Sequence, residues 1–392
     1  MAAMADAKLT KTLTTTLHLL DHFTNSLTSL PPEGTAQPPN TPSPPNLLST
    51  CATTLRAQTT KLSLLIITPP FTPSAIYTVV ASLNDAILPS LLTATLLLTP
   101  SNFTKAYSAE AISLTKATLR DLKPLIHLVE TRSQDGKPKA DPTAHQKSGV
   151  TEATGKIWED CDELFQLADG GIASFAVKKA EQYLELIKDA VKEIEEWDPE
   201  DDDDDYDSLF DDNQAETPPT EDTHEKPTTP PSSTPHDIAQ IKLSTLKILN
   251  RLPQSLHVVI HQRLKQGLPP TPFGLPQQIL ILDNITSKME QTSTCIDDVA
   301  ERLYTHDALG AMLTVEKARA CVVEIVEGVM VAGWDDASAV VVDGHEEGTK
   351  KDMTRVETKE DRYVKRALEW VKSAGTTNED VIQTRMLRSL VA

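Results

Sequence analysis

An acidic, proline-rich segment near the middle of this 392-residue chain sets the strongest limit on its fold. Residues 195–225 contain 16 aspartates and glutamates and no lysine or arginine, and a run of prolines overlaps their end. Such a segment has too few apolar side chains to offset the conformational entropy that it would lose on ordering. We therefore expect residues 198–236 to be a disordered linker between two folded halves, residues 1–197 and 237–392.

Most of the net charge of −20 comes from this segment, and the rest of the chain carries only about −4. A dedicated nucleic-acid-binding domain needs a surplus of lysine and arginine to displace the counterions of the phosphates. The charge balance therefore argues against direct binding of nucleic acid.

Apolar residues recur at steps of three and four in both halves, which is typical of one face of a helix. The regular series cover residues 48–66, 172–197, 282–303 and 309–326. Aromatic residues make up only 4% of the chain, so leucine, isoleucine, valine and alanine must fill the core, and these suit interleaved helices. The sequence predicts an all-α fold of two antiparallel helical bundles.

Residues 74–98 are almost entirely apolar or threonine, with Pro89 among them. Their β-branched content also fits a strand, but the length and the lack of turn residues favour a kinked, buried helix. Seven prolines between Pro31 and Pro45 predict a loop over residues 31–45, because proline disrupts helix interiors. Further loops are expected at about 265–275 and 333–358.

Motifs of the common enzyme classes are absent: GxGxxG, GxxxxGK[ST], HExxH and GxSxG do not occur. Histidine pairs at 18/22 and 257/261 have a spacing that can hold a metal on a helix, but neither has a third ligand nearby. The aspartates at 201–205 lack the glycine and the closing glutamate of a calcium loop. We expect a non-enzymatic protein with no metal and no cofactor.

Apolar side chains inside the acidic segment make it a candidate binding element for a protein partner. Such anchors let an unfolded acidic segment fold against a basic, grooved partner, and a solvated linker is the alternative. The candidate partner-binding residues are Tyr206, Leu209, Phe210, Asp211 and Asp212.

Two residues of the same region are candidate phosphorylation sites. Ser208 precedes the acidic residues that acidophilic kinases select, and Thr217 precedes a proline. A phosphate at either position would add negative charge and retune the attraction for basic partners.

The four cysteines are widely spaced and form no CxxC pair, which predicts reduced core thiols inside the cell. The N-terminal residues lack a basic segment followed by an apolar run, so we expect the chain not to be secreted. We find no stretch of about 20 apolar residues and expect no membrane span.

A distinctive stretch lies at residues 154–162, with the sequence TGKIWEDCD, and the helix that follows ends in EEWDP at residues 195–199 before the acidic run. This order resembles the cyclin-D-interacting protein family, also called the GCIP or human Maid-like family, and within it a fungal member. The specific similarity covers about residues 154–212. The residues that carry the motif are Trp158, Cys161, Asp162, Trp197 and Pro199.

The motif residues have the pattern of structural positions. Trp158 and Cys161 are three apart and can share a buried helix face, while the acidic residues at 159, 160, 162 and 163 stay in water. Trp197 can pack the end of its helix onto the bundle before Pro199 terminates it. A partner-facing surface is the alternative for both tryptophans.

The resemblance implies an adaptor-like protein of the cytoplasm and nucleus that influences cell-cycle progression or transcription through helix-face contacts. Its implied partners are proteins of the cyclin or transcription-regulator class. A different reading is also open, because long antiparallel bundles with few aromatics resemble the rods of vinculin- or talin-like proteins. That reading predicts a cytoskeletal or adhesion scaffold.

Overall fold

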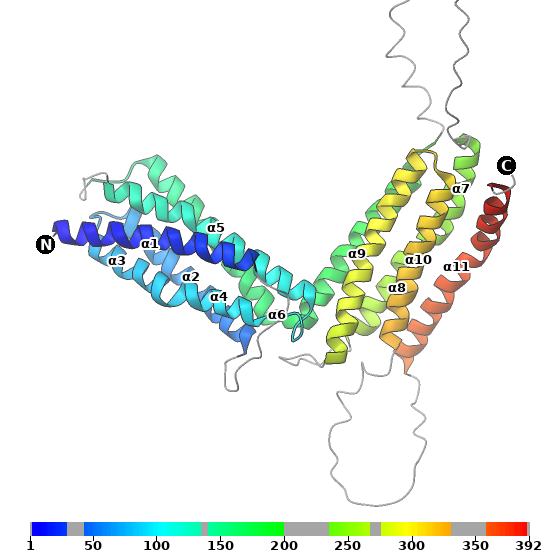
Figure 1. The fold of residues 1–392 in the computed structure, drawn as a ribbon, viewed down its shortest axis with the longest axis horizontal. Helices are drawn as coiled ribbons and strands as arrows, with labels where there is room; N and C mark the ends of the chain where they lie inside the picture. The colour runs from blue at the N-terminus through cyan, green and yellow to red at the C-terminus, as the bar shows by residue number, and fades with distance from the viewer. Residues whose placement is uncertain are drawn as a thin grey trace, which may run out of the picture. The chain divides into compact units, whose positions relative to one another are not determined.

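The computed structural model of the chain describes residues 2–29, 43–134, 140–199, 235–266, 276–330 and 358–389. Within these ranges every regular element is a helix, which confirms the predicted all-α fold (Figure 1). Most of the expected linker, residues 200–234, lies outside the described residues, as do most of the loops expected near 270 and 345.

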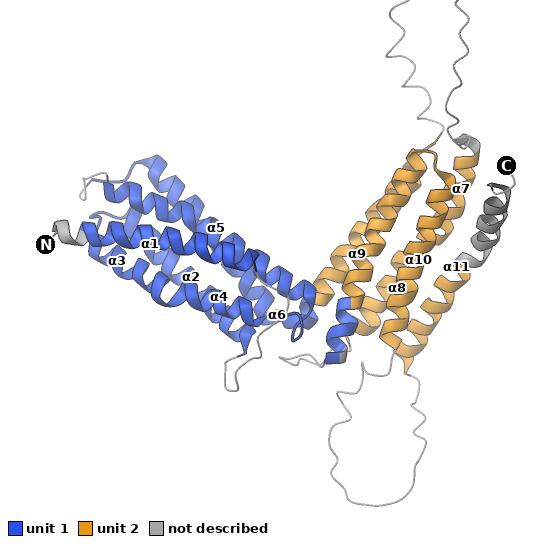
Figure 2. Ribbon diagram, in the orientation of Figure 1, with its two compact units in different colours: residues 1–175, 270–283 blue, residues 176–269, 284–392 orange. Residues whose placement is uncertain are grey.

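The chain forms two compact units, shown in different colours in Figure 2. Unit 1 comprises residues 1–175 and 270–283, and unit 2 comprises residues 176–269 and 284–392. This division differs from the predicted boundary at residue 197. Helix α6 (Ala144–Glu196) crosses from one unit to the other, and its part from Ala176 on belongs to unit 2, where Ile187 and Ile194 are fully buried.

Unit 1 is built from helices that pack in pairs. Helix α1 contacts α3 and α5, and α2 contacts α3 and α4. The elements are α1 (Ala2–Thr28), α2 (Pro44–Ile67), α3 (Pro73–Ser82), the π-helix η1 (Leu83–Ile87), α4 (Leu88–Leu97), α5 (Lys105–Gln134) and the first part of α6 (Ala144–Glu196). Unit 1 also includes the first residues of α9 (Pro276–Tyr304).

Prolines begin several of these helices. Helix α2 starts at Pro44, inside the loop predicted over 31–45, so that loop ends earlier than expected. Proline suits the first turn because its missing N–H has no partner there and its fixed φ is already helical. Helix α6 begins instead with a capping box, in which the Thr143 hydroxyl accepts from the Gln146 N–H at 3.2 Å and the Gln146 side chain accepts from the Thr143 N–H at 2.9 Å.

The apolar stretch predicted as a kinked helix forms α3, η1 and α4 in succession. The π-helical turn ends at Ile87, two residues before Pro89, which cannot supply a backbone donor. The stretch from α3 to α4 lies in the core of unit 1, where Ile76, Val80 and Leu91 are fully buried. Of the described helices, this one (73–97) is long and apolar enough to span a membrane, so the expectation of no such stretch is wrong by that criterion.

Gly171 interrupts helix α6. Its φ of +62° lies in the left-handed region, which glycine adopts without the steric cost of a Cβ atom. The apolar series predicted from residue 172 therefore begins directly after this break.

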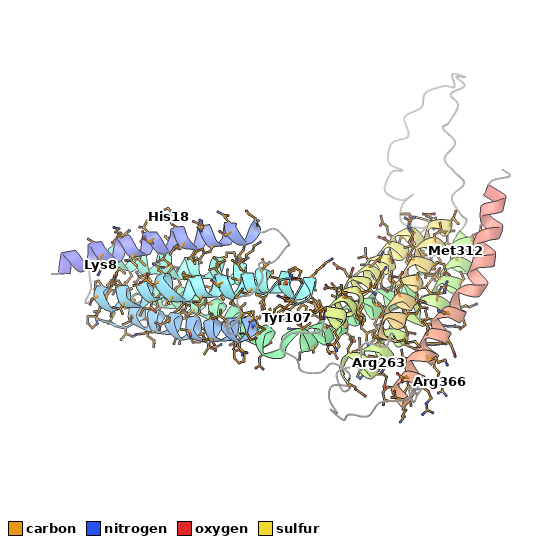
Figure 3. The ribbon with its side chains drawn as sticks, turned by 60° about the horizontal axis from the view of Figure 1, so that its bottom comes forward. Lys8, His18, Tyr107, Arg263, Met312 and Arg366 are labelled. Carbon is orange, nitrogen blue, oxygen red and sulfur yellow. The ribbon has the colours of Figure 1, made fainter. Side chains whose placement is uncertain are left out.

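Unit 2 is centred on α10, which contacts α7, α8 and α11. Met312, labelled in Figure 3, Val315 and Val322 are fully buried on it. The other elements are α7 (Pro235–Leu249), α8 (Leu252–Val259), the π-helix η3 (Ile260–Leu264), α9, α10 (Ala308–Met330), α11 (Lys359–Ser389) and the last part of α6.

The core of unit 1 contains a small aromatic cluster around Tyr107, the residue that Figure 3 labels. This fully buried ring stacks on Phe103 at a centroid distance of 5.5 Å and meets Phe175 edge-to-face at 5.4 Å. Its hydroxyl donates to the backbone oxygen of Leu167 at 2.9 Å, which satisfies the one polar atom of the side chain. All four cysteines are buried and free, as predicted.

A buried ion pair anchors the start of α11 in unit 2. Arg263 of η3 pairs with Asp361, and the side chains are 7% and 17% exposed. Asp361 also forms a capping box with Thr358, accepting from the Thr358 N–H at 2.9 Å. Burial disfavours the charged carboxylate, but the Thr358 N–H and the Arg263 guanidinium outweigh that cost and lower the pKa of Asp361 to about 2.

We expect Asp361→Ala to destabilise unit 2 by about 3 kcal/mol, because it leaves the guanidinium of Arg263 buried without its partner. Since the folded pKa lies below the ordinary value, the contribution is full above pH 4 and declines as the pH falls toward 2. Hydrogen exchange of the intact chain measures the effect, with exposed Asp298→Ala as the control. Equal exchange in α8, η3 and α11 of both variants would contradict this account.

Candidate interaction surface

The tryptophan of the TGKIWEDCD stretch lies where α6 packs against α2 in unit 1. The indole N–H of Trp158 donates to the hydroxyl of Thr60 on α2 at 3.0 Å. The guanidinium of Arg56, one turn earlier on α2, lies 5.2 Å from the centroid of the indole ring and forms an ion pair with Asp162. These four residues form the Trp158 cluster.

The Trp158 cluster holds its aromatic ring in place without burying it completely. The Thr60 hydroxyl donates in turn to the Arg56 backbone oxygen at 2.7 Å, so it acts both as acceptor and as donor. Trp158 and Arg56 are half-buried, and Asp162 is exposed. A ring fixed by a cation above its face and a hydrogen bond at its edge loses little freedom when a partner covers it.

Two exposed apolar side chains flank the cluster. Leu64 lies two turns after Arg56 on α2 and is 54% exposed, and Phe165 lies two turns after Trp158 on α6 and is 42% exposed. Residues at this spacing share a helix face, so both belong to the same side of their helices as the cluster. We call the cluster together with Leu64 and Phe165 the α2–α6 seam. Tryptophan, arginine and exposed apolar groups in one patch are the composition of a protein-contact surface.

The motif residues do not all occupy the environments that the sequence suggested. Cys161 is 2% exposed, and burial raises the pKa of its thiol to about 12. Asp162 is exposed, but it pairs with Arg56. Asp160 departs from the expectation of a fully hydrated carboxylate, because it is half-buried on the side of α6 that faces α5.

The environment of Asp160 is unfavourable for a negative charge. Burial, followed by the nearby carboxylates of Asp121 and Glu163, raises its pKa to about 6, and Arg120 only partly opposes this. Arg120 is engaged in an ion pair with Asp121 at 2.8 Å. One carboxylate oxygen of Asp160 is buried and accepts no hydrogen bond from the described residues. A neutral side chain would fit this position better at neutral pH.

We therefore expect Asp160→Asn to stabilise the chain by about 1 kcal/mol at pH 7, after allowance for solvent screening of a half-exposed group. A folded pKa above the ordinary value means that the folded state binds more protons, so stability falls as pH rises from about 4 to 6. The difference in thermal midpoint between variant and wild type should grow over that range. A difference that is constant from pH 4 to 7 would show that Asp160 ionises normally.

The second motif tryptophan follows the end of α6 in unit 2. Trp197 is half-buried and meets Tyr304 edge-to-face at a centroid distance of 4.9 Å. Lys242 of α7 lies 5.9 Å from the indole centroid and donates to the backbone oxygens of Trp197 and of Glu195, the latter at 2.9 Å. A lysine on the final carbonyls satisfies groups that a helix end leaves free and complements its dipole. Pro199 is buried in the turn that follows.

Replacing Lys242 tests this cap. Lys242→Met keeps the apolar stem but removes both hydrogen bonds and the cation beside Trp197, so we expect a loss of about 1 kcal/mol. Lys317→Met, at an exposed position in the middle of α10, is the control and should change stability little. Thermal unfolding of the two variants measures the difference, and equal midpoints would show that the cap contributes nothing.

A shallow groove runs between α6 and α9 in unit 2 and was not predicted. Ala190 and Ala300 contribute to its lining, and the carboxylates of Glu193, Asp297 and Glu301 line it; the groove has a volume of about 290 Å³. Burial, then the charges of Asp298 and Glu193, raise the pKa of Asp297. Sequence patterns did not reveal it because it depends on which two helices become neighbours.

The remaining candidate residues lie outside the described residues: Tyr206, Leu209, Phe210, Asp211, Asp212, Ser208 and Thr217. Among the residues that are described, no three histidine, cysteine or acidic side chains converge as metal ligands. The rings of His257 and His261 lie 4.1 Å apart, so this pair shares one helix face.

Comparison with known proteins finds a family and a relative to which the chain is similar. Residues 47–200 match the family model described as Grap2 and cyclin-D-interacting, N-terminal. The chain is also similar to an uncharacterized protein of Schizosaccharomyces pombe, with 24% identity over 274 residues that cover 68% of this chain and 72% of the relative. The family match includes every residue of the α2–α6 seam as well as Trp197.

Proposed function

We propose that the chain is a regulatory adaptor that binds proteins, because its residues 47–200 match the model of the Grap2 and cyclin-D-interacting family that its sequence resembles. It acts in the cytoplasm and nucleus and influences cell-cycle progression or transcription. Its partners are proteins of the cyclin class, which the family description names, or of the transcription-regulator class.

The α2–α6 seam is the observation that carries this proposal. It lies within the matched segment and presents a fixed tryptophan, an arginine and two exposed apolar side chains on one pair of helices. Tryptophan and arginine dominate the binding energy of many protein interfaces when a partner removes them from water. A partner helix laid along the seam would cover Leu64 and Phe165 and keep Trp158 at its centre.

The chemistry of the described residues supports binding rather than catalysis. A cysteine nucleophile requires an accessible thiolate, whereas Cys51 and Cys161 are buried and their pKa values are raised to about 11 and about 12. The α6–α9 groove presents carboxylates and a tyrosine without a histidine among its lining residues. We propose that the chain is not an enzyme.

Removing the apolar groups of the seam tests the proposal. We expect Leu64→Ser with Phe165→Ser to lose the protein partners captured by proximity labelling in cells, with thermal stability close to that of the wild type because both side chains are exposed. Leu186→Ser with Leu243→Ser makes the same change at exposed sites of unit 2 and is the matched control.

The outcomes separate the alternatives. Loss of cyclin-like or transcription-regulating partners from the seam variant alone supports the proposal. An unchanged partner list overturns the role of the seam, and a list dominated by actin-linked proteins favours the cytoskeletal scaffold instead.

A further inference from the structure

Helix α11 of unit 2 has a face on which cations and aromatic rings are interleaved. Lys359, Arg362 and Arg366 are exposed and form no ion pair with any described residue. Tyr363 and Trp370 are 42% and 38% exposed and lie two turns apart, on the same side of the helix. We call these five residues the α11 basic face, and Figure 3 labels Arg366 within it.

The aromatic rings of this face are held at the surface. Arg251 of α8 lies 5.5 Å from the Trp370 ring centroid and donates to the Trp370 backbone oxygen and to the Ser373 hydroxyl, both at 3.0 Å. The Lys359 ammonium lies 6.0 Å from the Tyr363 ring centroid. The opposite side of α11 is buried, so the helix cannot rotate to hide these rings.

The charges around the face leave it positive. The acids of α11 in this region are Glu360, Asp361 and Glu369, and Asp361 is already paired with Arg263. Lys365 and Arg251 add two cations, and Lys372 pairs with Glu327 of α10. Five cations therefore stand against two free carboxylates over four helical turns.

The same chain contains a segment of complementary chemistry. Residues 200–212 carry nine aspartates and glutamates, together with Tyr206, Leu209 and Phe210. The segment follows directly after Pro199 of unit 2. Thirteen extended residues can span up to about 45 Å. The α11 basic face is only about 17 Å long along the helix axis from Lys359 to Trp370, so the segment is long enough to cover it.

We propose that residues 200–212 bind in cis to the α11 basic face, with their carboxylates against Arg362 and Arg366 and their apolar side chains against Tyr363 and Trp370. One exposed ion pair contributes little, but a tethered segment is present at an effective concentration of about millimolar, so several weak contacts suffice. A protein partner that uses the acidic segment then has to displace it from α11. The displacement of the segment by a partner rests on the proposed function, whereas the docking itself does not.

Photocrosslinking of the purified full-length chain tests the docking without any partner. With p-benzoylphenylalanine in place of Tyr363, we expect crosslinks to peptides within 200–212 at low salt. Their yield should fall by about fivefold or more at 1 M NaCl, where charges on exposed groups are screened within about 3 Å. Arg362→Glu with Arg366→Glu should cause the same loss, and Lys11→Glu with Lys61→Glu, at exposed positions of unit 1, should not.

Reversing the charges of the acidic segment provides a second test of the docking. Lysine in place of the aspartates at 201–205 should restore the crosslink in the Arg362→Glu, Arg366→Glu variant. Crosslinks to other segments, a yield that does not change with salt or charge reversal, or a yield that rises with protein concentration would each overturn docking in cis. Absence of crosslinks to residues 200–212 in a chain whose α11 binds a single-stranded oligonucleotide would also overturn it, because the face would then be a nucleic-acid site.

Discussion

The burial of narrow apolar stripes on long helices is the interaction on which the rest of this structure depends, and α6 supplies such a stripe to both compact units. Ile157 and Leu164 are fully buried in unit 1, and Ile187 and Ile194 are fully buried in unit 2. Each helix buries only one side in this arrangement, because aromatic residues are too few to fill a thicker core. The exposed sides of the helices carry polar and aromatic groups. These groups form the α2–α6 seam and the α11 basic face, on which the proposals about function rest.

The two motif tryptophans illustrate how the stripes and the surface are connected. Neither is fully buried, and each is held by a cation from a neighbouring helix, Arg56 for Trp158 and Lys242 for Trp197. The first lies on a surface seam and the second closes the end of its helix. We propose that the same residue type serves binding in unit 1, whereas it closes the end of a helix in unit 2, and the difference lies in the exposed apolar groups of the seam around Trp158.

Periodicity was sufficient to predict the helices, because apolar steps of three and four leave no other regular structure for residues 48–66 or 282–303. It also located the helix that starts after Gly171. The environments of individual side chains were harder to predict. Asp160 lies one residue before a buried cysteine, and only the position of α5 reveals that it faces Asp121. Leu64 and Phe165 have the identities of core residues, and their exposure depends on which helices cover which faces.

Hydrogen exchange of the intact chain with a purified partner protein tests the central claim most directly, which is that the α2–α6 seam binds proteins. The account predicts slower exchange in α2 and in the first part of α6 when the partner is added, with the rest of unit 1 unchanged. Slower exchange confined to unit 2, or no change in α2 and α6 with a partner that is demonstrably bound, would contradict it.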